Sequence, residues 1–472
     1  MNYEFLIKEL FLMTGSIGFI FCLNLLSSPK TAKKGNILGM LSMCVIIIVY
    51  VYEISNCVKK TEILLILLFL SAFIGLLTSK KIKMTEMPQL VAVFNGLGGL
   101  SSTFVSIVEI LNTIKKEGVI NNYELLIAMS GIMIGAITFT GSFVAYLKLQ
   151  ELISSSCIIF YGHKTITTFT ILILLLTVIF CNYNNSNIEI INICLFFSLF
   201  FSFFLGILLV IPIGGADMPV VISLLNSYSG IAACLAGFVI NNKVLIISGS
   251  LVGASGIILT KLMCQAMNRS IINVTFGAFY IKVSDSLKQI KENYAREYLP
   301  VDAAILLNNS NKVIIIPGYG LAVSQAQHNI KEISNILKEN NINVKYAIHP
   351  VAGRMPGHMN VLLAEADVSY EDLLDLEQVN QEFEDTDTVL IVGANDVVNP
   401  LARTEKTSPI YGMPILNADK SKNIIVFKRG KGKGFSGIDN PLFYMEKTGT
   451  IYGDAKKSIV NLINEIKVLN NK

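Results

Sequence analysis

Charged residues are scarce in this chain. Of its 472 residues only 15% are charged, whereas 52% are hydrophobic, which lies outside the usual balance of a soluble globular protein. The apolar surplus lies before about residue 265. The net charge is only +4, and acidic and basic residues are roughly balanced after residue 285, so neither half has the single-sign field of a nucleic-acid binder. We therefore expect a membrane-embedded first half and no nucleic-acid partner.

The sequence also lacks the cysteine spacing of a disulfide framework or a metal site. All eight cysteines lie in the apolar half without short paired spacings, so we interpret them as inert thiols within helices, and no metal is predicted. A signal-peptide cleavage pattern is missing as well. Lys8 and Glu9 interrupt the first apolar segment early, which indicates a retained helix.

Nine apolar windows are long enough to cross a bilayer core of about 30 Å. They lie at 4–25, 36–53, 62–79, 90–112, 124–147, 167–182, 189–210, 219–240 and 244–263. The sixth window is short, and only residues 241–243 separate the last two. Residues 1–265 are therefore predicted to form an all-α transmembrane bundle of about nine helices.

Lysines are more frequent after the odd-numbered windows than after the even-numbered ones. The first group comprises Lys30, Lys33, Lys34, Lys80, Lys81, Lys83, Lys148 and Lys164, and the second comprises Lys59, Lys60, Lys115, Lys116 and Lys243. Because cytoplasmic loops are enriched in positive charge, this bias puts the amino terminus outside. With an odd number of spans, it predicts a multi-pass inner (plasma) membrane protein whose carboxy-terminal domain is cytoplasmic.

The second half of the chain has the pattern of an α/β domain. We interpret the polar stretch 266–300 as a linker or connecting helix and 301–472 as a separate domain. Strands and helices alternate there, with strands expected at 312–316, 342–348, 388–392, 423–427 and 449–452, and helices at 321–339, 358–366, 369–380 and 455–469. This alternation predicts a doubly wound, mainly parallel sheet.

A glycine-rich turn follows the first of these strands. Gly318 and Gly320 would let the main chain approach a pyrophosphate, and the following helix offers free N–H groups and a positive dipole end. The turn is equally compatible with a tight structural connection. An ordinary NAD site would also have an acidic residue after the second strand, but the sequence there continues into a second glycine-rich loop that contains Arg354.

A basic loop follows the fourth strand. Residues 428–434 contain four cations and three glycines, a composition that suits a phosphomonoester such as the 2′-phosphate that distinguishes NADP from NAD. The alternative is a solvated basic turn. Asp396, after the third strand, is either the cap of the next helix or a carboxylate beside a ligand.

Several longer segments resemble the beta subunit of proton-translocating NAD(P) transhydrogenase. The resemblance rests on 317–327, 349–360, 392–400 and 453–456 in the second half, and on 84–88, 138–142, 214–220, 225–230 and 267–270 in the first. It covers essentially the whole chain. It implies a Rossmann-like NADP(H)-binding domain in which the dinucleotide is reversed relative to the ordinary orientation, which would account for the missing acidic residue.

The resemblance also implies which residues contact the cofactor. The pyrophosphate would lie near Gly318, Tyr319, Gly320, Val351, Ala352, Gly353 and Arg354. The 2′-phosphate would be held by Lys428 and Arg429, and a lid over the nucleotide would be formed by Phe435, Ser436 and Gly437, where many relatives have tyrosine at the position of Phe435. Further contacts are implied for Val323, Gly393, Ala394, Asn395, Asp396, Gly453, Asp454 and Ala455. Near the nicotinamide, Asp396 would couple protonation to nucleotide affinity.

Polar residues within the apolar helices or near their ends are candidates for a proton path, because burying them in a membrane is costly. The candidates are Asn95, Asp217, Asn226 and Asn242. Each could instead form a helix–helix hydrogen bond. Many relatives have histidine where this chain has Asn95, and since asparagine does not titrate, a relay there would need water or a neighbouring carboxylate.

The expected function is hydride transfer between NADH and NADP⁺ coupled to proton translocation. The resemblance implies a Re/Si-specific enzyme that is active only with an alpha subunit, which would bind NAD(H), and a complex that forms a dimer in the lipid bilayer. An alternative from another class is a transporter or channel gated by a regulatory dinucleotide-binding lobe without redox chemistry. Such a regulator would work without an NADH-binding partner and leave its nucleotide unchanged.

Overall fold

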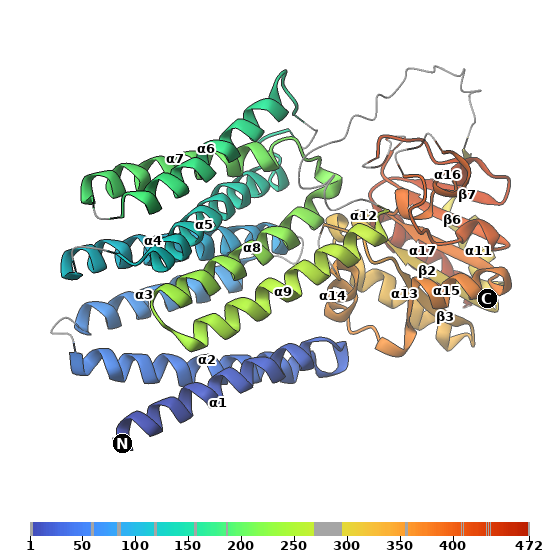
Figure 1. Ribbon diagram of the computed structural model, residues 1–472. Coiled ribbons are helices and arrows are strands. Elements are labelled where there is room, and N and C mark those ends of the chain that lie inside the picture. The colour runs from blue at the N-terminus through green and yellow to red at the C-terminus, as the bar shows by residue number, and fades with distance from the viewer. Residues whose placement is uncertain are drawn as a thin grey trace. The chain divides into compact units, whose positions relative to one another are not determined.

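The computed structural model describes residues 3–57, 61–82, 86–117, 120–154, 158–185, 187–268, 295–354, 357–406, 408, 410–430, 432, 434 and 436–470. The chain divides into two compact units (Figure 1). The first comprises 1–154, 158–212 and 222–259, and the second contains the other described residues. The first unit is built from long helices and the second around a β-sheet, which confirms the predicted fold class.

Nine helices in the described residues are long and apolar enough to cross a membrane. They are α1 (Tyr3–Leu26), α2 (Pro29–Cys57), α3 (Thr61–Lys81), α4 (Met87–Glu117), α5 (Asn122–Leu149), α6 (His163–Tyr183), α7 (Ile188–Val210), α8 (Met218–Val239) and α9 (Lys243–Ala266). Each predicted window falls on one of them. Most of the helices extend beyond the apolar windows because polar residues continue their first and last turns.

The helical unit has a tightly packed centre and an open edge. The α4 and α5 backbones are in close contact, since a Cβ on Gly99 would lie 2.7 Å from the Gly135 carbonyl oxygen. A buried apolar cluster joins α4 and α5 to α6 and α7 through Met129, Cys181 and Ile191. In contrast, the apolar window of α3 contributes no fully buried residue, so most of its apolar surface is uncovered in the described part of this unit.

The second unit contains a parallel sheet of seven described strands. In chain order they are β1 (Arg296–Glu297), β2 (Lys312–Pro317), β3 (Asn343–Ile348), β4 (Leu373–Asp375), β5 (Thr388–Val392), β6 (Asn423–Lys428) and β7 (Thr448–Tyr452). Their order across the sheet is β1-β7-β6-β5-β2-β3-β4, and every pairing is parallel. Apart from the edge strand β1, this is the strand order of a doubly wound dinucleotide-binding fold.

The two faces of the sheet are covered by different layers. Val313 and Ile315 of β2 pack into the cluster that includes α11 (Pro300–Asn308), α12 (Tyr319–Ser324), α13 (Gln327–Glu339), α14 (His358–Glu365) and α17 (Ala455–Asn470). Ile314 and Ile316 point the other way, into a cluster with α15 (Leu376–Glu382) and the short turns η4 (Phe383–Asp385), η5 (Asp396–Val398), η6 (Ala418–Lys420) and η7 (Pro441–Tyr444). This alternation explains why the central strands are continuously apolar in sequence.

The structure differs from the predicted elements in three places. The helix predicted at 321–339 is broken into α12 and α13 because Gln325 adopts a left-handed conformation with φ of 51°. The prediction of a single helix at 369–380 is wrong. The turn η3 (Tyr370–Asp372) and strand β4 precede α15 there, and β4 pairs with β3. Strand β1 and helix α11 were not predicted, and the two-residue β1 exists only through its pairing with β7.

Candidate functional site

The candidate site lies where the order of the strands reverses. From β2 the chain proceeds to β3 on one side, whereas β5 pairs with β2 on the other. In open parallel sheets a crevice forms at this reversal, at the carboxyl ends of the strands, and ligands bind in it. The glycine-rich turn predicted after the first strand follows β2 directly, so it lies at this position.

Glycines bring the loops after β2 and β5 into backbone contact. The Gly318 N–H donates to the Val392 carbonyl oxygen (2.9 Å), and the Gly320 N–H donates to that of Gly393 (3.0 Å). A Cβ on Gly318 would lie 2.4 Å from the Gly393 carbonyl oxygen, and one on Gly393, whose φ is 67°, would lie 2.3 Å from the Gly320 Cα. Side chains are excluded from this contact, so the two loops pack main chain against main chain at the carboxyl ends of β2 and β5.

The loop after β3 is shaped by a second glycine and a histidine. Gly353 has φ of 105°, and a Cβ there would clash with the His358 ring. His358 Nδ1 accepts a hydrogen bond from the Arg354 N–H (3.0 Å), so the proton of the neutral ring is on Nε2. Burial, and then the neighbouring Arg354, lower the pKa of His358, which keeps the ring neutral.

Arg354 lies across the site from the first glycine turn. Its guanidinium carbon is 4.4 Å from the centre of the Tyr319 ring, a cation–π contact between the loop after β3 and the start of α12. The contact holds a cation beside Gly318 and Gly320. Val351 and Ala352 belong to the same loop, and Ala352 packs into the core. Val323, one turn into α12, is 51% exposed.

His349 fixes the beginning of the same loop. Its Nδ1 accepts a hydrogen bond from the Val351 N–H (3.2 Å), and its Nε2 donates to the Pro414 carbonyl oxygen (2.7 Å). Burial lowers the pKa of His349 to about 4. The side chain is therefore a neutral tether between two loops.

The loop after β5 is bonded to the segment that was predicted to be a lid. Ser436 donates twice to the Asp396 carboxylate, from its N–H to Oδ2 (3.0 Å) and from its hydroxyl to Oδ1 (2.7 Å). The Asn440 amide donates to the Asn395 carbonyl oxygen (3.0 Å). Asp396 begins η5 and is not its cap, so the capping alternative is wrong. Phe435 lies outside the described residues, while Gly437 is exposed.

The predicted basic loop starts at the carboxyl end of β6. The Lys428 Nζ lies 4.8 Å from the centre of the Phe443 ring, and burial lowers the pKa of Lys428. Arg429 is exposed. The turn after β7 is joined to this end, because the Gly453 N–H donates to the Lys428 carbonyl oxygen (3.0 Å). Asp454 accepts from the Lys457 N–H and thereby caps α17, which begins at Ala455.

The site has features that fit a dinucleotide. Among the described residues the buried Nε2 of His358 has no hydrogen-bond partner, although the ring's tautomer makes it a donor. This donor is at the start of α14, next to the loop that carries Arg354, and both groups would suit a phosphate. His349, His358 and Asn440 were missed as site residues. The two histidines lie within the motif 349–360, but the pattern alone does not show which ring nitrogen is bonded.

Comparison with known proteins agrees with this geometry. The chain matches the NAD(P) transhydrogenase beta subunit family over residues 8–465. Two curated relatives, both named NAD(P) transhydrogenase subunit beta, come from Rhodospirillum rubrum and from a named strain of that species. Each is 42% identical over 452 residues, which cover 94% of this chain and 96% of the relative.

The chain belongs to the NAD(P) transhydrogenase beta subunit family. Membership implies proton-coupled hydride transfer between NAD(H) and NADP(H), and a beta subunit implies an alpha partner. The predicted family and enzyme class are confirmed. The alternative of a channel with a purely regulatory lobe loses its support.

For a transhydrogenase beta subunit, the polar residues of the spans are of particular interest. The Asn95 side chain in α4 donates to the Ile222 carbonyl oxygen of α8 (3.3 Å), which is a helix–helix hydrogen bond. Asn242 caps α9 by accepting from the Leu245 N–H (3.1 Å). Asn226 is half-buried within α8, and Asp217 is buried in the turn η2 (Gly215–Asp217). Asn95 and Asn242 therefore have separate structural contacts, and the four residues lie in different parts of the helical segments.

Proposed function

We propose that the sheet unit binds NADP(H) at the carboxyl ends of its strands and exchanges hydride with NAD(H) held by the alpha subunit. The observation that carries the proposal is the backbone contact between the loops after β2 and β5 at the reversal of strand order. The described part of the chain contains one such reversal of strand order. The binding site for the second nucleotide is therefore expected on another chain. The enzyme would be of the Re/Si-specific type.

The pyrophosphate of NADP(H) would lie between the glycine turn at 318–320 and the loop 351–354. The turn leads directly into α12, whose amino-terminal end carries the partial positive charge of the helix dipole. Arg354, held on the Tyr319 ring, and the free Nε2 donor of His358 would supply charge-assisted hydrogen bonds. No acidic side chain follows β3, which suits a reversed dinucleotide.

The 2′-phosphate would be held by Lys428 and Arg429. Burial disfavours the ammonium of Lys428, and a phosphate beside it would offset that cost by favouring the charged form. Arg429 is exposed and would present a planar guanidinium to the same group. Further contacts are proposed for Val323, for 393–395 and for the turn 453–455, in keeping with the resemblance.

Asp396 is proposed to couple protonation to closure of the lid 435–437. Its two carboxylate oxygens each accept a bond from Ser436, and a proton added to either oxygen would make that oxygen a donor and a weaker acceptor. Protonation would therefore loosen the lid. NADP(H), when bound, supplies or accepts the hydride at its nicotinamide. Hydride transfer needs two nicotinamides held in contact rather than an acid or base, so Asp396 is given a coupling role.

The nine spans are proposed to move the proton. We assign 1–265 to this membrane domain, 266–300 to a linker and 301–472 to the cytoplasmic NADP(H) domain, in a complex that forms a dimer. The proton would pass near Asn95, Asp217, Asn226 and Asn242. Since Asn95 does not titrate, the path there would use water or a nearby carboxylate.

The proposal is tested with membrane vesicles in which the chain is co-expressed with a candidate alpha subunit. Reduction of an NADP⁺ analogue by NADH is followed with an imposed proton gradient and again after a protonophore collapses it. We expect the gradient to accelerate reduction. The same rate of reduction with and without the gradient would contradict proton coupling. Vesicles without the alpha subunit, which should be inactive, are the control.

A further inference from the structure

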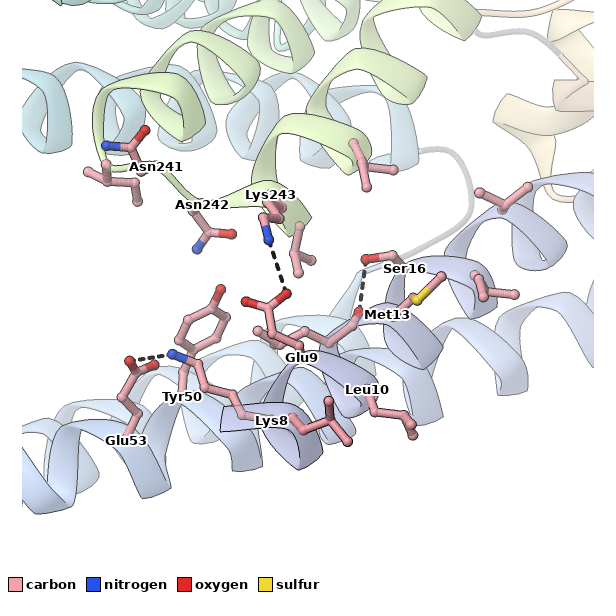
Figure 2. A pocket seen from close by; sticks show the side chains of 17 residues that line it. Lys8, Glu9, Leu10, Met13, Ser16, Tyr50, Glu53, Asn241, Asn242 and Lys243 are labelled. Carbon is pink, nitrogen blue, oxygen red and sulfur yellow. Dashed lines mark hydrogen bonds and ion pairs between the residues drawn. The ribbon is translucent and has the colours of Figure 1, made fainter. Parts of the chain in front are cut away.

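The helical unit contains a groove that shares one lining residue, Asn242, with the proposed proton path. It lies between α1, α2 and the turn from α8 to α9, and its volume is about 730 Å³ (Figure 2). This is within the range of about 300–1,000 Å³ typical of small-molecule sites. None of its lining residues belongs to the proposed NADP(H) site.

The groove is long. Its lining residues run along α1 from Leu6 to Ile20, a rise of about 21 Å at 1.5 Å per residue. This length suits an extended chain that lies along α1.

The walls of the groove are apolar and uncovered. The lining includes Leu10, Met13, Ile17 and Ile20 of α1, which are 57%, 66%, 42% and 48% exposed, and Ile247 of α9. In a span these side chains meet lipid tails unless protein covers them. An acyl chain would match both their chemistry and the length of the groove.

One end of the groove carries four charges, which we call the charged rim: Lys8, Glu9, Glu53 and Lys243. Lys8 of α1 pairs with Glu53 of α2, and the Glu9 carboxylate lies 3.2 Å from the Lys243 ammonium of α9 (Figure 2). The Lys243 side chain is 76% exposed, so this second pair is open to another ligand. Figure 2 also shows the Tyr50 hydroxyl pointing toward Asn242 above the rim.

The charged rim lies at a membrane surface. Lys8 is in the first turn of its span, Glu53 ends the second span, and Lys243 begins the ninth. The rim is thus at the depth of lipid headgroups, and the apolar part of the groove runs from it into the hydrocarbon. Its two lysines and two glutamates have no net charge, which favours a zwitterionic headgroup over an anionic one.

We propose that this groove binds one zwitterionic aminophospholipid, with its phosphate beside Lys243, its primary ammonium beside Glu9 and one acyl chain along α1. The ammonium can donate a hydrogen bond to the carboxylate, whereas a trimethylated choline cannot. An anionic headgroup has a phosphate but no ammonium group. The rim favours it less, because the rim has as many carboxylates as ammonium groups.

Native mass spectrometry of the full chain in detergent tests the proposal. Delipidated protein is mixed with phosphatidylethanolamine, phosphatidylcholine or phosphatidylglycerol of identical acyl chains, and bound lipids are counted. We expect ethanolamine lipid to be retained about tenfold better than the other two, the loss of one charge-assisted hydrogen bond being worth about that factor. Equal retention of the three lipids would overturn the proposal.

Two kinds of variant locate the site. The double substitution Glu9→Gln with Lys243→Gln should abolish the headgroup preference, while Glu62→Gln with Lys80→Gln, at exposed ends of α3, removes the same charges elsewhere and should preserve it. If the first double variant does not fold, Met13→Trp, which leaves both ion pairs intact, should block the groove and abolish retention. An unchanged headgroup preference in the Glu9→Gln, Lys243→Gln variant, or unchanged retention in Met13→Trp, would overturn the proposal, as would lipid that binds the isolated chain but is displaced in its complex with the alpha subunit.

Discussion

His349 shows how one buried side chain makes the stability of the nucleotide site depend on pH. The folded ring is neutral, with a pKa lowered to about 4 from 6.5, and it tethers Val351 to Pro414. Between these two pH values the unfolded chain binds a proton that the folded chain does not. Stability is therefore fully present above about pH 6.5 and is lost as the pH falls toward 4.

We predict that the sheet unit loses about 2 kcal/mol of unfolding free energy between pH 7 and pH 5 through His349. Pulse proteolysis of the detergent-purified chain in a urea series measures this. His349→Gln is the matched control, since an amide can form the same two bonds without titrating. Its pH dependence should be smaller but not zero, because the pKa of His358 is lowered as well. An identical pH dependence in both proteins would refute the role of His349.

Arg429 gives a second prediction at the scale of single residues. Arg429→Ala should weaken NADP(H) binding about tenfold to a hundredfold, because a charge-assisted contact with a phosphate is lost. Binding of an analogue that lacks the 2′-phosphate should change little. Calorimetric titration of both ligands measures the difference, with Arg403→Ala, which breaks only the ion pair with Asp419, as the control. Equal losses for the two ligands would show that Arg429 does not contact the 2′-phosphate.

At the scale of elements, most of the correct predictions of strands and loops came from apolar runs and glycine-rich turns. The strands β2, β5 and β6 are continuously apolar because both faces are covered, so their ranges were predicted to within one residue. In contrast, β4 has three residues and lies at the edge, where its pairing with β3 rather than its own sequence makes it a strand. Local patterns carry no signal for such an element.

Local sequence patterns also explain which residues of the site were predicted from the sequence. Gly318, Gly320 and Arg354 lie in loops whose composition departs from that of a helix or strand, and the structure brings these loops together at the end of the sheet. The bonds from Ser436 to Asp396 join residues 40 positions apart, and the ion pair of Glu9 with Lys243 joins residues 234 apart. Spacing in a single sequence does not reveal contacts of this kind.

The contact between the loops after β2 and β5 can be tested directly. Gly393→Ala would force a Cβ onto a residue with φ of 67° and to within 2.3 Å of the Gly320 Cα. We expect a loss of stability on the order of 3 kcal/mol, from backbone strain together with overpacking, and loss of NADP(H) binding. Gly430→Ala, where a new Cβ would meet nothing within 4 Å, should unfold at the same urea concentration as the unaltered chain. A stable Gly393→Ala protein would contradict the close contact.

At the scale of the whole molecule, the membrane orientation decides whether the sheet unit meets the cellular nucleotides. We propose, from the lysine bias, that the amino terminus lies outside; the nine spans found in the described residues would then put the carboxy-terminal unit in the cytoplasm. The helix α6 offers a matched pair of reporters. Tyr161 precedes it and Tyr183 ends it, and their side chains are 105% and 88% exposed.

We predict that a membrane-impermeant maleimide labels Tyr183→Cys but not Tyr161→Cys in right-side-out vesicles, and that the pattern reverses in inverted vesicles. The sixth span runs outward in this orientation, so its end reaches the outer solution while its beginning remains inside. The unaltered chain is the control for its own thiols, of which Cys22, Cys181, Cys194 and Cys264 are buried. Labelling of Tyr161→Cys from outside would place the sheet unit on the outer side, away from cytoplasmic NADP(H), and the proposed reaction would then have no supply of its nucleotide.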